Sequence, residues 1–120
     1  MVSEALESAK LLKENGISAG VINMHTIKPI DIECLDILFR RSKLIVTVEE
    51  HSVIGGLGSA IAEYKANKVA SPPQLIIGLP DRFDSAGDYQ YLLEKHGLVS
   101  NKIVATVLDF AKINHLNIYD

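Results

Sequence analysis

Helical and strand-like segments alternate along this 120-residue chain, and that alternation constrains its fold more than any other feature. The clearest strand is the apolar run of residues 44–48, Leu-Ile-Val-Thr-Val. A continuous apolar run, rather than an alternating one, is typical of a strand that helices cover on both faces of a parallel sheet. Alternating elements also favour right-handed crossovers. We therefore expect a three-layer α/β fold with a mostly parallel sheet flanked by helices.

Apolar spacing, caps and turn residues give the expected order helix, strand, helix, strand, helix, strand, helix, helix. The expected helices are residues 2–15, 31–42, 59–68, 88–96 and 100–115, and the expected strands are residues 17–27, 44–48 and 75–77. In this architecture each helix normally follows a strand, yet the sequence opens directly on a helix. We therefore expect the sheet to lack its first strand.

Length, charge and cysteine content limit the class of protein. A chain of 120 residues suits a single domain over residues 1–120 that buries one core without metals or disulfides. The net charge of -3 gives no basic stripe for nucleic acid or an anionic membrane. Cys34 is the only cysteine, which favours a reducing, cytoplasmic location. No apolar run approaches the length of about 18 residues needed to cross a membrane.

Residues 48–60, Val-Glu-Glu-His-Ser-Val-Ile-Gly-Gly-Leu-Gly-Ser-Ala, are the strongest candidate for a functional site. In open parallel sheets, ligands gather at the carboxyl ends of strands. A carboxylate beside an imidazole suits acid–base chemistry, and glycines before a helix can expose N–H groups to an anion. The candidate interface or regulatory residues in this segment are Glu49, Glu50, His51, Gly55, Gly56 and Gly58.

A structural role is the stronger interpretation of the same segment. The glycines miss the dinucleotide-binding spacing, because isoleucine occupies position 61, and no Gly-Lys-Ser/Thr follows for a phosphate loop. Two carboxylates beside the loop also repel phosphate, and tight turning accounts for the glycines. We therefore predict interface or structural contacts here rather than direct chemistry.

A second polar loop, residues 81–88, follows the third expected strand, and Asp81 and Arg82 are its candidate interface or regulatory residues. They suit a small polar ligand, but an Arg–Asp pair that only holds a loop in shape is the commoner case. Ser85 has no Gly-x-Ser-x-Gly frame, so we do not expect a serine hydrolase.

The remaining histidines and the cysteine are not candidates for a catalytic or metal-binding role. His25, His96 and His115 lack the closely spaced partners of a zinc site. Cys34 has no local redox partner and is expected to be a small buried thiol. We predict no catalytic, cofactor-binding or metal-binding residue in this chain.

An ordered set of motifs carries a family resemblance over residues 2 to about 110. The motifs are Thr-Ile-Lys-Pro-Ile-Asp at 26–31, Ile-Val-Thr-Val-Glu-Glu-His at 45–51, Gly-Gly-Leu-Gly at 55–58, Gly-Leu-Pro-Asp-Arg-Phe at 78–83 and Ser-Ala-Gly at 85–87. With them, the chain resembles the C-terminal domain of the transketolase family. Deoxyxylulose-phosphate synthases and 2-oxoacid dehydrogenase β subunits share that domain. The Asp-Arg-Phe loop and Leu-Leu-Glu-Lys-His-Gly-Leu at 92–98 are most similar to split-type transketolase.

The resemblance implies a complete enzyme that uses thiamine diphosphate and a divalent metal, Mg²⁺, to transfer a two-carbon ketol unit between sugar phosphates, as in the pentose phosphate pathway. The pyrophosphate-binding and pyrimidine-binding domains of that enzyme hold the cofactor, so this chain alone is expected to bind none and to be inactive. The cofactor-activating glutamate belongs to the pyrimidine domain, so Glu49 and Glu50 do not inherit its role. The resemblance also implies a strand before residue 1.

The resemblance leaves this chain a role in packing against the other domains and in holding a dimer or other homo-oligomer. Two alternatives stay open. One is a regulatory module that receives a small effector at residues 49–59. The other is the equivalent domain of a deoxyxylulose-phosphate synthase or a 2-oxoacid dehydrogenase β subunit.

Overall fold

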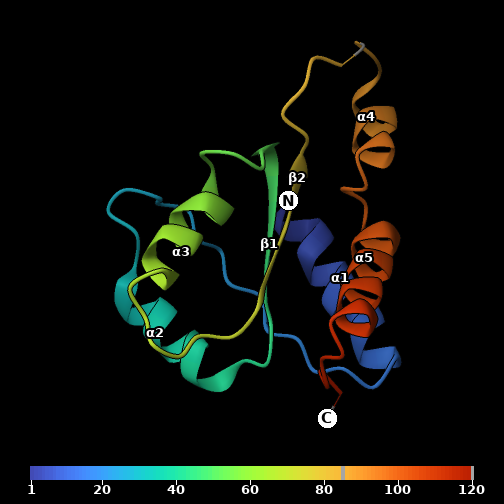
Figure 1. The fold of residues 1–120 in the computed structure, drawn as a ribbon. Coiled ribbons are helices and arrows are strands. Elements are labelled where there is room, and N and C mark those ends of the chain that lie inside the picture. Colours follow the sequence, from blue (N-terminus) through green and yellow to red (C-terminus); the bar gives the residue numbers. More distant parts are fainter. Residues whose placement is uncertain (85, 120) are drawn as a thin grey trace.

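The computed structural model describes residues 1–84 and 86–119. Its elements in chain order are α1 (Val2–Glu14), α2 (Ile32–Arg41), β1 (Ile45–Ser52), α3 (Leu57–Lys65), β2 (Gln74–Leu79), α4 (Tyr89–Lys95) and α5 (Ser100–Ile113). The two strands pair in parallel, with Ile45 opposite Gln74 and Val48 opposite Ile77. Figure 1 shows α2 and α3 on one side of this pair and α1, α4 and α5 on the other. The predicted α/β class, a parallel sheet flanked by helices, is confirmed.

Local end signals set the helix boundaries. Helix α2 begins after Asp31, whose carboxylate accepts a hydrogen bond from the amide of Cys34 at 2.9 Å, and Asp88 caps α4 in the same way. The chain leaves α1 through Gly16, where φ is +76°, and leaves α4 through Gly97, where φ is +73°. Glycine adopts this left-handed backbone without steric cost. All five predicted helices are confirmed, with ends shifted by a few residues.

The predicted strand at residues 17–27 is wrong. These residues form neither helix nor strand, and the described sheet has two strands rather than three. Val21, Ile22 and Ile27 favour extended backbone, but a strand exists only where a neighbour supplies hydrogen bonds. β1 pairs with β2, and a cavity separates its other edge from this segment.

β1 is longer than its apolar run. It continues to Ser52, so Glu49, Glu50 and His51 lie inside the carboxyl end of the strand rather than after it. Ile45, Thr47 and Glu49 are buried, whereas Glu50 and His51 are exposed. The pairing register with β2 is irregular between Val48 and Ser52, at the point where the strand meets the glycine-rich loop.

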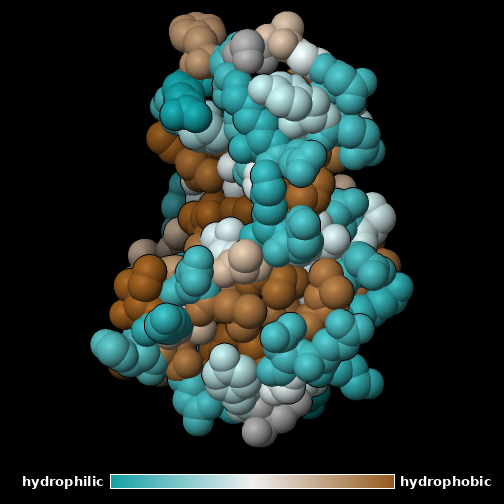
Figure 2. All heavy atoms as spheres, turned by 90° about the vertical axis from the view of Figure 1, so that its right-hand side faces the viewer, coloured by the Kyte–Doolittle hydropathy of each residue, from teal (hydrophilic) through white to brown (hydrophobic). Residues whose placement is uncertain are grey.

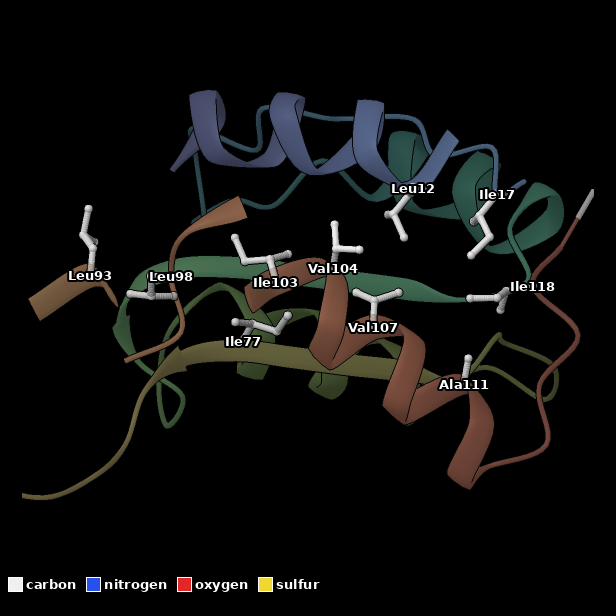
Figure 3. Close-up of a cluster of buried hydrophobic side chains, with 10 residues drawn as sticks. All are labelled: Leu12, Ile17, Ile77, Leu93, Leu98, Ile103, Val104, Val107, Ala111 and Ile118. Atoms are coloured by element: carbon white, nitrogen blue, oxygen red, sulfur yellow. The ribbon is translucent and has the colours of Figure 1, made fainter. Parts of the chain in front are cut away.

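The main core lies between the sheet and the helices α1, α4 and α5. Its buried side chains point toward one another in Figure 3 and are Leu12, Ile17, Ile77, Leu93, Leu98, Ile103, Val104, Val107, Ala111 and Ile118. On the opposite face, Leu35 of α2 and Ile61 of α3 are buried. In the described residues, no helix combines the length and apolar character needed to cross a bilayer.

Candidate functional site

Glu49 is a buried carboxylate that caps helix α3. Only 8% of Glu49 is exposed. Its Oε2 accepts a hydrogen bond from the amide of Leu57 at 2.7 Å, and its Oε1 accepts one from the amide of Gly58 at 2.8 Å. The first amides of a helix have no partner within the helix, and the helix dipole favours a negative charge there. Glu49 therefore supplies the cap that Gly56, at the N-cap position, cannot provide.

The glycines let the loop approach this carboxylate. A Cβ on Gly56 would lie 1.9 Å from Glu49 Oε2, and a Cβ on Gly58 would lie 2.5 Å from Cγ2 of Ile76. Both distances are far below van der Waals contact. Gly55 is required for a different reason, because its φ is +79°. Its amide donates to Ser59 Oγ at 2.8 Å.

These contacts oppose the hypothesis that the loop binds an anion. The amides of Gly55, Leu57 and Gly58 already donate to side-chain oxygens of the chain itself. An incoming phosphate would have to displace a buried carboxylate from two of these amides. The structural interpretation of the glycines is therefore the better supported one.

Glu50 and His51 face solvent at the same strand end. Glu50 accepts a hydrogen bond from the hydroxyl of Tyr89, at 2.9 Å, which ties β1 to the start of α4. This bond raises the pKa of the Tyr89 hydroxyl. His51 Nδ1 lies 2.9 Å from the carbonyl oxygen of Ser52, so it donates when it carries a proton. Tyr89 was not among the predicted site residues, and no local pattern marks this contact between residues 39 positions apart.

Asp81 and Arg82 lie exposed in the loop after β2. No hydrogen bond or ion pair joins their side chains to each other or to Glu50 and His51 within the described residues. The loop is instead held by Asp84, which forms an ion pair with Lys95 and lies 3.3 Å from His96 Nε2. Ser85 is outside the described residues.

The remaining candidates stay separate. His25 contacts its neighbour Thr26, and His115 follows α5. Cys34 is half-buried rather than fully buried. Among residues 1–84 and 86–119, no group of three or more His, Cys, Asp or Glu side chains could hold a metal ion. The strand end thus presents one carboxylate committed to structure and an exposed polar rim of Glu50, His51 and Tyr89.

Replacing Glu49 tests the cap directly. Glu49→Gln keeps the shape of the side chain but removes the charge and turns one acceptor into a donor that faces an amide. We expect a loss of about 1.5–3 kcal/mol in the free energy of unfolding, the range for hydrogen bonds to charged groups. Urea unfolding measures it, with exposed Glu50→Gln as the matched control, expected within about 0.5 kcal/mol of the parent chain. Equal effects of the two variants would contradict the capping role.

Comparison with known proteins gives a consistent result. The family "Transketolase, C-terminal domain" matches residues 1–103. The chain is 44% identical over 112 residues to the "Putative transketolase C-terminal section" of Methanocaldococcus jannaschii, covering 92% of this chain and 34% of that protein. It is 40% identical over 108 residues to the 1-deoxy-D-xylulose-5-phosphate synthase of Caldanaerobacter subterraneus subsp. tengcongensis, covering 90% of this chain and 17% of that protein.

A solved structure described as "Split gene transketolase, inactive beta4 tetramer" superposes with a TM-score of 0.77 at 42% identity, covering 90% of this chain and 34% of that chain. The chain thus spans about a third or less of the length of these relatives. The match over residues 1–103 nonetheless includes both strands and all of the predicted site residues. The chain belongs to the transketolase C-terminal domain family.

Proposed function

We propose that this chain is the non-catalytic C-terminal domain of a transketolase, with a role in packing against the other domains and in assembling the oligomer. The complete enzyme transfers a two-carbon ketol unit between sugar phosphates with thiamine diphosphate and Mg²⁺. The supports are the family match and the relatives named as a transketolase C-terminal section and a split-gene transketolase. A cytoplasmic location is part of the proposal, because the single cysteine suits a reducing compartment.

The observation that carries the non-catalytic role is the geometry of Glu49. Both of its oxygens accept hydrogen bonds from the start of α3 and the side chain is buried, so its role within the chain is that of a helix cap. No other cluster of the described residues offers three acidic, histidine or cysteine side chains to a metal ion. These residues do not fit a metal–diphosphate group, and we derive no catalytic step through it.

Exposed apolar side chains support the assembly role. Figure 2 shows the face that carries α1, α4 and α5, where hydrophobic side chains gather between hydrophilic ones in the middle and lower part. Leu6 on α1 is 51% exposed, Tyr91 on α4 is 56% exposed and Ile113 on α5 is 75% exposed. Phe83, in the loop after β2, is fully exposed. Large apolar side chains exposed on three helices and a loop suit contacts with other domains or subunits.

A second candidate is that the complete enzyme is a 1-deoxy-D-xylulose-5-phosphate synthase. The chain is 40% identical to one such enzyme, which is close to its 44% identity with the transketolase C-terminal section. The Asp-Arg-Phe sequence at 81–83 favours transketolase. Both candidates give this chain the same accessory role.

The proposal predicts that the isolated chain does not bind the cofactor. Titration calorimetry with thiamine diphosphate and Mg²⁺ is expected to show no saturable heat, because the described residues offer no metal–diphosphate site. The complete enzyme in the same buffer is the positive control. A metal-dependent dissociation constant in the micromolar range for the chain alone would overturn the accessory role.

A second prediction separates assembly from chemistry at Glu50. In the complete enzyme, Glu50→Gln is expected to weaken assembly or cofactor retention while the single-turnover rate of the assembled fraction stays within about threefold of the parent. Tyr89→Phe is the matched variant, because it removes the donor of the hydrogen bond to Glu50 and leaves the carboxylate in place. Sedimentation velocity measures assembly. A rate loss of several orders of magnitude with normal assembly would instead place Glu50 at the reacting atoms.

A further inference from the structure

A surface pocket lies between the end of α3 and the start of β2, beside the loop of residues 66–73 that joins them in Figure 1. Its volume of about 420 Å³ is within the size range of small-molecule sites. This α3–β2 pocket is at the amino end of β2, whereas Glu49 and Glu50 are at the carboxyl end of β1. It is therefore separate from the candidate site described above. The residues that line it are Ala62, Lys65, Ala66, Ser71, Gln74 and Ile76.

Lys65 is the only ionisable side chain that lines the α3–β2 pocket, and it is half-buried. Within residues 1–84 and 86–119, no hydrogen bond or ion pair joins its Nζ to another group. Gln74, on the other wall, donates through Nε2 to the carbonyl of Gly58 at 2.8 Å, and its Oε1 has no hydrogen-bond partner among those residues. Burial disfavours a charge that nothing compensates, so it lowers the pKa of the Lys65 ammonium.

Lys68, three residues further along, is the opposite case. Its Nζ lies 2.8 Å from Oδ1 of Asp36 and 4.4 Å from the centre of the Tyr64 ring. The hydrogen bond with Asp36 raises the pKa of Lys68. Among the described residues, only Lys65 is a half-buried lysine without a partner. The other lysines are either bonded, as are Lys10, Lys43, Lys95 and Lys102, or exposed, as are Lys13, Lys28 and Lys112.

These features suit a nucleophilic amine. The unprotonated form of a lysine is the nucleophile, and partial burial without an ion-pair partner increases its fraction near neutral pH. The pocket gives a small electrophile room beside Nζ of Lys65, and Ser71 supplies a hydroxyl group on its wall. No acid or histidine lines the pocket, so an electrophile must already carry a good leaving group. A small acyl phosphate meets both requirements, of size and of reactivity.

We propose that Lys65 is a modification site, acylated on Nζ by a small acyl phosphate that enters the α3–β2 pocket. The unprotonated amine attacks the carbonyl carbon, the bond from that carbon to the phosphate oxygen breaks, and an amide bond forms. The proton lost by the amine leaves with the phosphate as hydrogenphosphate. Acylation removes a positive charge from the last turn of α3, where a cation complements the helix dipole. The inference goes beyond the accessory function, since no other domain or cofactor takes part.

Competition among the lysines of the 120-residue chain tests the site without any substitution. The chain is treated with acetyl phosphate, and peptide mass spectrometry gives the initial acetylation rate at each lysine. At about pH 8, Lys65 is expected to react about fivefold or more faster than Lys68, because each unit of pKa difference changes the unprotonated fraction about tenfold. Lys65 is also expected to react faster than the exposed Lys112. Equal or faster reaction at Lys112 would overturn the proposal, because modification would then follow exposure alone.

Two matched variants test the cause of the selectivity. Ala62→Glu places a carboxylate on the pocket wall, three positions before Lys65 on α3, and is expected to slow acetylation of Lys65 about threefold or more while Lys68 is unchanged. Asp36→Asn removes the ion-pair partner of Lys68 and is expected to speed acetylation of Lys68 while Lys65 is unchanged. An unchanged rate at Lys65 in Ala62→Glu would contradict the proposal, because the environment of the pocket would then not control the reaction.

Discussion

The hydrogen bonds from the start of α3 to Glu49 organise the carboxyl end of the sheet. The Glu49 side chain links the carboxyl end of β1 to the first two amides of α3, across the glycine loop. Because the carboxylate lies so close to the loop, a Cβ at position 56 would force the Glu49 side chain to shift. The path from strand to helix is therefore fixed by a buried charge and by the absence of one side chain. Helix α3 in turn carries Ile61 into the core on the α2 side of the sheet.

This arrangement explains why a segment with two glutamates and a histidine need not be an active site. Its buried carboxylate is committed to the helix, while the exposed one contacts Tyr89 across the domain. The chain belongs to the transketolase C-terminal domain family and matches about a third or less of the length of its longer relatives.

Local signals in the sequence predicted the helices, because caps such as Asp31 and turns such as Gly97 act over a few residues. Residues 17–27 were predicted as a strand from their β-branched side chains. That prediction failed because such side chains indicate a preference for extended backbone and do not show that a partner strand is present. The difference between Glu49 and Glu50 was also missed. Extending the alternation of Ile45 and Thr47 by two residues places Glu49 on the buried side. The contacts of Asp84 and Tyr89 join elements distant in sequence, and only the folded chain brings them together.

A double-mutant cycle between Glu49 and Gly56 tests the central interaction most directly. Gly56→Ala places a Cβ against the carboxylate, so in the parent chain it should cost about 1–3 kcal/mol of unfolding free energy, the usual range for overpacking. In a Glu49→Ala background the obstructing oxygen is gone, and the same substitution should cost less by at least about 1 kcal/mol. If urea unfolding instead gives the same cost for Gly56→Ala in both backgrounds, Glu49 does not fix the path of the loop.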